Sequence, residues 1–175
     1  MELTTRLVGN KAPSFCEQAV MPDATIQKVS LSDFITANKW LVLFFYPKDF
    51  TFICPAEIMA LSARMEEFKH LDTDIVGISS DTVHTHLEWT QTPVAKGGIG
   101  KLNYPLLEDT SYTVAKNYGV FVEKDSETLR GLFIINPEGE VVYETIHLNI
   151  VSREVDEILR VLTALQTGGL CEIEW

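Results

Sequence analysis

The hydrophobic positions along the chain form runs typical of buried strands. The strongest is WLVLFFY at 40–46, which does not alternate and therefore favours a central strand covered on both faces. DIVGISS at 74–80 predicts a second buried strand. LFIIN at 132–136 and EVVYETI at 140–146 are separated only by the Pro-Glu-Gly turn at 137–139, so we expect them to form an antiparallel hairpin.

Apolar side chains at helical spacing predict helices between these strands. Residues 55–69 begin with Pro55, which is acceptable at a first helical position because its missing N–H would be unpaired there. The predicted stripe of this helix is Ile58, Leu61, Met65 and Phe68. A second helix begins at Asp81, whose side chain is available as the N-cap, and a short helical segment lies around 111–118. The last helix begins near Ser152, and its predicted buried face is Val155, Ile158, Leu159, Leu162 and Leu165.

The order of these elements predicts the fold class. Strand, helix, strand and helix, followed by a hairpin and a helix, favour an α/β protein with a thioredoxin-like fold, in which a mixed central sheet carries helices on both faces. No stretch of the sequence is typical of a linker, an internal repeat or a low-complexity tract. We therefore expect a single domain over residues 1–175.

Composition and charge exclude several classes of protein. The apolar fraction of 46% is typical of a globular domain, and the longest uninterrupted apolar run is far shorter than the roughly 20 residues of a membrane-spanning helix. A net charge of −11 repels phosphate backbones and anionic lipid surfaces, so we expect neither nucleic acid nor a membrane as partner. The opening MELTTRLVGN has no apolar signal core, which predicts a cytoplasmic location.

Three cysteines in such a chain suggest redox chemistry. Cys54 follows a predicted buried strand and immediately precedes the predicted helix at Pro55. Unpaired backbone N–H groups and the helix dipole at that position would stabilise a thiolate and lower its pKa. The alternative is that Cys54 is a small buried hydrophobic side chain, which is the usual role of a lone cysteine.

The sequence around Cys54 carries a specific motif. In FYPKDFTFICPAE, residues 45–57, Pro47, Thr51 and Cys54 have the spacing Pro-x-x-x-Thr-x-x-Cys. This motif resembles that of the peroxiredoxins, specifically the typical two-cysteine group that includes alkyl hydroperoxide reductase C-type peroxidases. The resemblance extends over almost the whole chain, through HLEW at 86–89, GGIGKLNYPLL at 97–107, LRGLFIINPEG at 129–139 and SREVDEILR at 152–160.

The resemblance implies roles for individual residues. Cys54 would be the peroxidatic cysteine, the nucleophile that attacks a hydroperoxide. Thr51 would orient the peroxide, and Pro47 would shield the thiolate from water. Arg130 corresponds to the family's active-site arginine. Two further positions match the network that holds this guanidinium in place: Glu57 and Arg153.

The resemblance also implies a second working thiol near the C-terminus. Cys171, in a tail of about residues 167–175, corresponds to the resolving cysteine, which normally belongs to the partner subunit. The flanking sequence Leu170-Cys171-Glu172 departs from the family's usual Val-Cys-Pro, so whether Cys171 resolves within or between chains stays open. Cys16 lies outside every motif, and we interpret it as a structural or incidental thiol.

The implied function is a thiol-dependent peroxidase that reduces hydrogen peroxide and organic hydroperoxides. Such chemistry requires no metal, haem or flavin cofactor in the chain. The electron donor would be thioredoxin or a flavoprotein disulfide reductase. The implied assembly is a homodimer, and the sequence does not distinguish a dimer from a decamer of five dimers.

Parts of the sequence are compatible with other functions. A holdase chaperone or a peroxide-sensing redox relay could use the same residues, whereas a general disulfide oxidoreductase is disfavoured because Cys-Pro-Ala-Glu lacks a second cysteine. His84 and His86 are two residues apart on a predicted helix and have no cysteine close in sequence. We therefore predict that both are surface histidines and that they form no zinc site.

Overall fold

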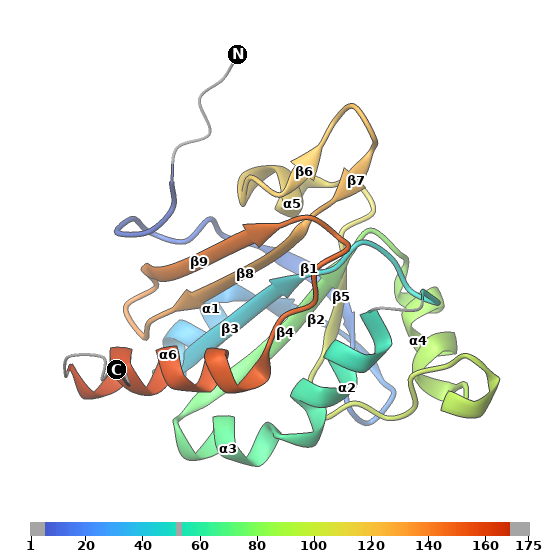
Figure 1. Ribbon diagram of the computed structural model, residues 1–175, viewed down its shortest axis with the longest axis horizontal. Helices are drawn as coiled ribbons and strands as arrows, with labels where there is room; N and C mark the ends of the chain where they lie inside the picture. The colour runs from blue at the N-terminus through green and yellow to red at the C-terminus, as the bar shows by residue number, and fades with distance from the viewer. Residues whose placement is uncertain (1–5, 52–53, 169–175) are drawn as a thin grey trace.

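The structure, a computed structural model, describes residues 6–51 and 54–168. Its centre is a seven-stranded mixed sheet with the strand order β2-β1-β5-β4-β3-β8-β9 (Figure 1). The strands are β1 (Cys16–Val20), β2 (Ile26–Ser30), β3 (Trp40–Phe45), β4 (Thr73–Ser79), β5 (Leu106–Glu108), β8 (Arg130–Ile135) and β9 (Val141–His147). A separate two-stranded ribbon consists of β6 (Phe121–Val122) and β7 (Glu127–Thr128).

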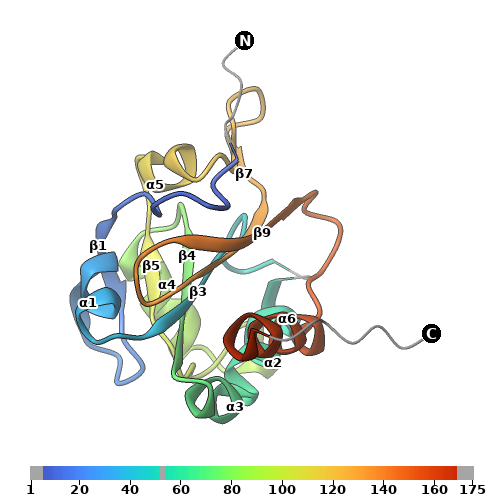
Figure 2. The ribbon, with the colours of Figure 1, turned by 90° about the vertical axis from the view of Figure 1, so that its left-hand side faces the viewer.

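Helices cover both faces of the sheet. Figure 2 shows α2, α3 and α6 on one side and α1 and α5 on the other. The helices are α1 (Leu31–Thr36), α2 (Cys54–Ala63), α3 (Met65–His70), α4 (Val83–Gln91), α5 (Thr113–Asn117) and α6 (Val155–Thr167), with a 3₁₀ turn at Val94–Lys96. Two apolar clusters result, one on each face. The prediction of a thioredoxin-like α/β fold with helices on both faces is confirmed.

Strand β3 lies inside the sheet, where it pairs in parallel with β4 and antiparallel with β8. Leu41, Leu43 and Phe45 pack into the cluster beneath α1 and α5. Val42 and Phe44 pack into the opposite cluster, beneath α2, α3, α4 and α6. The unbroken apolar run predicted from the sequence is therefore explained, because both faces of β3 are covered.

The helix predicted over 55–69 is in fact two helices. Arg64 leaves helical geometry, with φ −105° and ψ 18°, and separates α2 from α3. Its guanidinium binds Glu67 of α3 and Asp156 of α6. The predicted stripe continues across the break, because its four members are all buried in the same cluster. Hydrophobic periodicity detects that shared face but does not detect a one-residue interruption.

The ends of the helices also differ from expectation. The N-cap of α4 is Thr82, whose Oγ1 accepts a hydrogen bond of 3.2 Å from the Thr85 N–H. The predicted cap, Asp81, instead accepts from the backbone N–H of Asp49 at 2.8 Å. Helix α6 begins at Val155, later than predicted, and extends to Thr167. It therefore includes the first residue of the tail expected at 167–175.

The N-terminal hairpin β1–β2, helix α1 and strand β5 were not predicted. Strand β5 has only three residues and lies between β4 and β1 in the sheet. The hairpin β8–β9 agrees with the prediction, and Gly139 in its turn has φ 82°, a conformation that glycine adopts without steric cost. Within the described ranges, no helix has the length and apolar character needed to cross a membrane.

Candidate active site

The segment after β3 carries the motif residues and continues toward α2. Pro47 and Thr51 are partly buried, and the Thr51 hydroxyl donates to the Lys48 carbonyl at 3.0 Å. Phe50 between them has φ 55°, in the left-handed region that non-glycine residues rarely adopt. Cys54 is the first residue of α2, one residue before the predicted helix start at Pro55, and its side chain lies outside the described part of the chain.

A buried charge cluster lies at the first turn of α2. Glu57 is 4% exposed and Arg130, at the start of β8, is 1% exposed. One oxygen of the Glu57 carboxylate lies 3.5 Å from Nη1 of Arg130. The backbone N–H of Arg153 donates to the other oxygen at 2.6 Å, and the Arg153 guanidinium also binds this carboxylate. The structure therefore brings together three of the residues singled out by the sequence.

Both guanidiniums are also fixed by backbone carbonyls. Nε of Arg130 donates to the Asn149 carbonyl at 2.9 Å, and Nη1 of Arg153 donates to the Gly131 carbonyl at 2.7 Å. The Arg153 guanidinium lies 5.0 Å from the centre of the Phe44 ring. Because the planar guanidinium has several donors in a rigid fork, these contacts determine both its place and its orientation.

Two surface clefts border the motif residues. A cleft of about 420 Å³ is lined by Pro47 and Lys48 together with residues of the turn after β4, of the segment before α5 and of the turn between β6 and β7. A second, of about 320 Å³, is lined by Glu57, Arg153 and their neighbours on α2 and at the start of α6. One cleft thus opens beside Pro47 of the motif, and the other opens beside the cluster of Glu57 and Arg153.

The prediction for His86 is wrong. Its side chain is completely buried, whereas His84 is exposed, as predicted. The two histidines do point to different faces of α4, but the face of His86 is the one that packs against the sheet. Val83 and Trp89, three residues away on either side, are buried on that face as well. This i, i+3, i+6 spacing is the signal in the sequence that places His86 on the buried face.

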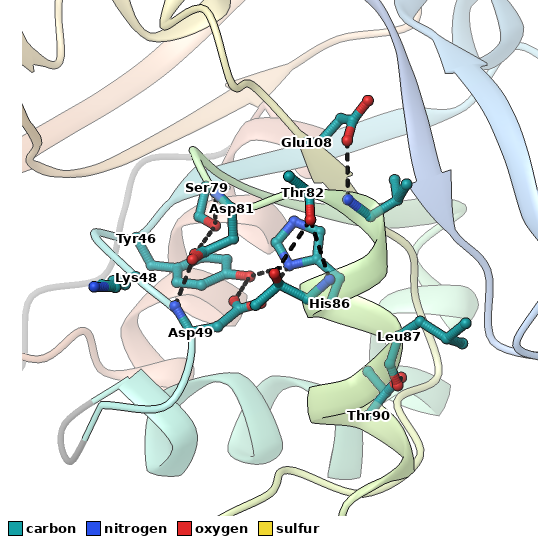
Figure 3. A network of polar contacts seen from close by, with 12 residues as sticks. Tyr46, Lys48, Asp49, Ser79, Asp81, Thr82, His86, Leu87, Thr90 and Glu108 are labelled. Atoms are coloured by element: carbon teal, nitrogen blue, oxygen red, sulfur yellow. Dashed lines mark hydrogen bonds and ion pairs between the residues drawn. The ribbon is translucent and has the colours of Figure 1, made fainter.

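His86 belongs to a buried polar network that links α4 to the segment after β3 (Figure 3). Its Nδ1 lies 2.6 Å from Oδ2 of Asp49, and its Nε2 lies 3.0 Å from the Leu107 carbonyl. The Tyr46 hydroxyl donates to Oδ1 of Asp49 at 2.8 Å. Asp81 accepts from the Asp49 N–H and from the Ser79 hydroxyl. Sequence reasoning named neither Asp49 nor Tyr46 as a candidate.

The network shifts the pKa values of its members. Burial raises the pKa of Asp49, although its hydrogen bond to His86 opposes this. Burial acts to lower the pKa of His86, but the hydrogen bond and charge of Asp49 and the Leu107 carbonyl outweigh it, so the His86 pKa is raised. Ligand atoms of Asp49, Asp81 and His86 lie within 4.8 Å of one another, but hydrogen bonds within the network already engage them.

Of the other two cysteines, the structure describes only Cys16. Cys16 opens β1 and is exposed. Cys171 lies outside the described residues, beyond α6. The pairing of Cys54 with Cys171 therefore stays a prediction.

Comparisons with known proteins identify the family. The chain matches the AhpC/TSA family over residues 8–144. It is 52% identical over 173 residues to YkuU of Bacillus subtilis, which is named as a candidate peroxiredoxin; the match covers 99% of this chain and 96% of YkuU.

Solved structures agree with this assignment. The reduced 2-Cys peroxiredoxin of Plasmodium vivax superposes with a TM-score of 0.92 at 39% identity, covering 98% of this chain and 90% of that chain. AhpC of Mycobacterium bovis gives a TM-score of 0.86 at 32% identity, covering 100% and 99%. The chain therefore belongs to the AhpC/TSA family and is a peroxiredoxin, an oxidoreductase of the peroxidase type.

Proposed function

We propose that Cys54 reduces hydrogen peroxide and organic hydroperoxides by direct nucleophilic attack. The thiolate sulfur bonds to one peroxide oxygen while the O–O bond breaks, and the other oxygen leaves as water or an alcohol after gaining a proton. Cys54 is oxidised by two electrons to a sulfenic acid, and the peroxide is reduced by two electrons. The observation that carries this proposal is the buried Glu57–Arg130–Arg153 cluster at the first turn of the helix that Cys54 begins.

The start of α2 supports the formation of the thiolate. The first backbone N–H groups of a helix have no partner within the helix, and the dipole there is positive, so an anion is stabilised. A cysteine at such a position has a lowered pKa and is more often ionised near neutral pH. In this proposal Pro47 shields the thiolate and Thr51 orients the bound peroxide.

Arg130 acts mainly on the transition state. Negative charge develops on the departing oxygen as the O–O bond breaks, and a fixed guanidinium stabilises that charge without needing to reorient. The carbonyl of Asn149 and the carboxylate of Glu57 hold Arg130 in one orientation before the reaction starts. Arg153 is a positioning residue, because its contacts hold Glu57.

The catalytic cycle closes through Cys171. Its thiol attacks the sulfenic sulfur of Cys54, an S–S bond forms and water leaves. An external dithiol, thioredoxin or a flavoprotein disulfide reductase, then reduces this disulfide and restores both thiols. In this proposal Cys171 comes from a second copy of the chain, so the working unit is a homodimer or an assembly of dimers. A cytoplasmic location stays a prediction from the sequence.

Non-reducing electrophoresis after one equivalent of hydrogen peroxide tests this cycle. We expect a disulfide-linked dimer from the wild type and none from Cys54→Ser or Cys171→Ser. Cys16→Ser is the matched control and retains the dimer. A disulfide that persists in Cys171→Ser but disappears in Cys16→Ser would contradict the assignment of the resolving thiol.

The role of Arg130 is tested by stopped-flow measurement of peroxide reduction. Removing a comparable preorganised donor from an enzyme lowers the rate on the order of 10²–10³-fold, and we expect a loss of this size for Arg130→Ala. Arg160→Ala is a suitable control, because Arg160 is an exposed residue of α6 that pairs with Glu157. A rate for Arg130→Ala close to that of the wild type would exclude the proposed role.

A further inference from the structure

Asp49 attaches the segment from Tyr46 to Thr51 to two other parts of the molecule, the turn after β4 and helix α4. Its backbone N–H donates to Asp81, in the turn after β4, at 2.8 Å. Its carboxylate accepts from the Tyr46 hydroxyl at 2.8 Å and contacts His86 of α4 at 2.6 Å. Asp49 is only 2% exposed, so its backbone and its side chain are both held inside the protein (Figure 3).

The residue that follows Asp49 is strained. Phe50 adopts φ 55°, and a non-glycine residue in the left-handed region costs about 1–3 kcal/mol unless its surroundings enforce that conformation. Two sets of contacts hold Phe50 in this conformation. Asp49, the residue before it, is bound to Asp81 and His86, and the Phe50 ring packs 6.0 Å from the ring of Trp89, which lies on α4 like His86. Thr51 directly follows this strained residue, so the contacts of Asp49 determine where Thr51 lies.

The partners of His86 assign its protons. Nε2 faces the Leu107 carbonyl, which only accepts hydrogen bonds, so this nitrogen carries hydrogen. Nδ1 and the Asp49 carboxylate, 2.6 Å apart, share one further proton. If that proton were lost, the lone pair of Nδ1 would face a buried carboxylate, and the contact would become repulsive. The attachment of the segment therefore depends on one shared proton.

We propose that Asp49 and His86 are positioning residues of the peroxidase site: their buried pair holds the segment 46–51 in the conformation that places Thr51 beside the start of α2. This inference rests on the reaction proposed above for Cys54. Neither residue touches the peroxide. Their effect is exerted through the backbone, since Asp49 lies two residues before Thr51 and five before Cys54.

The positioning is sensitive to pH in one direction. The groups that face His86 are Asp49, Tyr46 at the end of β3, Asp81 after β4 and the Leu107 carbonyl of β5. Asp49, Asp81 and the Leu107 carbonyl favour the protonated imidazole, and they raise its pKa against the opposing effect of burial. The pair is therefore intact below the raised pKa of His86, and the segment is released as the pH rises through that pKa.

The experiment compares His86→Gln with His84→Gln, an exposed residue of the same helix. Stopped-flow rates with hydrogen peroxide are measured across pH for both variants and for the wild type. A misplacement of about 1 Å can cost on the order of 10²-fold in rate, and we expect His86→Gln to lose up to this amount. The wild type and His84→Gln are expected to lose rate on the alkaline side, whereas His86→Gln lacks that loss.

Tyr46→Phe is the second variant, because it removes only the hydroxyl that binds Asp49 and preserves the packing of the ring. We expect a smaller loss of rate and an alkaline loss that begins at higher pH, because the hydroxyl lowers the pKa of Asp49 and without it the pair holds its shared proton more tightly. If His86→Gln is folded by circular dichroism and has the rate and pH profile of His84→Gln, the inference is overturned. It is overturned as well if His86→Gln loses only stability while its rate and pH profile are unchanged.

Alkylation separates this inference from the proposed function. The rate of peroxide reduction is measured for Cys54→Ser and for the wild type. Equal rates would refute the peroxidase role of Cys54 and would leave the positioning role of Asp49 and His86 to the alkylation experiment. Iodoacetamide reacts with the Cys54 thiolate without any peroxide, and peptide mass spectrometry follows its extent. A pH dependence of Cys54 alkylation that differs between His86→Gln and His84→Gln supports the positioning role, and identical profiles overturn it.

Discussion

Two buried charge clusters flank Cys54 in the sequence. In each of them a carboxylate is held by basic side chains, and the basic side chains differ between the two clusters. Glu57 follows Cys54 and is held by the guanidiniums of Arg130 and Arg153. Asp49 precedes Cys54 and is held by the imidazole of His86. Both carboxylates are almost completely buried. An arginine stays charged at every physiological pH, whereas a histidine can lose its proton.

The difference separates two tasks. In the proposed mechanism the arginine cluster supplies a fixed positive charge for the chemical step, and its state does not change with pH. The proposed role of the histidine pair is to attach the segment 46–51, and that attachment can be released. The same site thus combines a constant electrostatic element with a titratable structural one.

The largest expected effect comes from removing the acid of each cluster in turn. Breaking a buried ion pair by removing one partner costs about 3–5 kcal/mol, and we expect a loss of this size for Glu57→Gln because the two guanidiniums cannot neutralise themselves. Asp49→Asn should cost less, because His86 can lose its proton and become neutral. Urea unfolding at pH 7, at equal protein concentration, measures both losses of unfolding free energy.

Glu66→Gln provides the control for this comparison. Its carboxylate is 77% exposed and pairs with Lys69 on α3, and exposed pairs contribute only about 0–1 kcal/mol. Equal losses for Glu57→Gln and Asp49→Asn would show that the imidazole behaves as a permanent charge, and the distinction between the two clusters would then fail.

A smaller effect is expected in the pH dependence of stability. The pKa of His86 is raised in the folded state, so the stabilisation from its protonated form is fully present below about pH 6.5, the ordinary pKa of histidine. It is lost as the pH rises through the raised value. Burial also raises the pKa of Asp49, but the pair shares one proton, so the two shifts describe the same titration and have the same direction.

Urea unfolding of the wild type and of His86→Gln over a pH series measures this effect. We expect the difference in unfolding free energy between them to be largest on the acid side and to shrink as the pH rises. His84→Gln should follow the wild type throughout. A difference that grows with rising pH would reverse the sign and contradict the assignment of the shared proton.

The sequence was informative about the arginine cluster and misleading about the histidine pair. Arg130, Glu57 and Arg153 were found because the family motif names their positions, and no property of the isolated residues predicted that they would meet. Their separation of up to 96 residues explains this, because only the packing of α2 against β8 and the start of α6 brings them together.

His86 was misjudged for a different physical reason. A histidine on a helix is most often exposed, and the spacing of His86 from His84 carries no information about Val83 and Trp89, the buried residues on its own face. Its partner Asp49 lies in an irregular segment where no periodicity operates. The fold itself was easier to predict, because strands such as β3 and β4 carry long apolar runs, whereas three-residue β5 has too few positions for a pattern.

The smallest expected effect concerns the cap of the helix that carries His86. The Thr82 side chain satisfies the Thr85 N–H, and replacing a threonine cap by alanine costs about 1 kcal/mol of unfolding free energy. Thr82→Ala should lower stability by this amount and leave the peroxide rate unchanged, since His86 is also held by Asp49 and the Leu107 carbonyl.

Asp81→Asn is the informative comparison, because Asp81 binds the Asp49 N–H instead of capping the helix. We expect the peroxide rate of Asp81→Asn to fall while that of Thr82→Ala does not. The two variants therefore distinguish a loss of helix stability from a loss of positioning of the segment 46–51. A loss of rate in Thr82→Ala comparable to that of His86→Gln would mean that the start of α4, and not the pair itself, controls the segment 46–51.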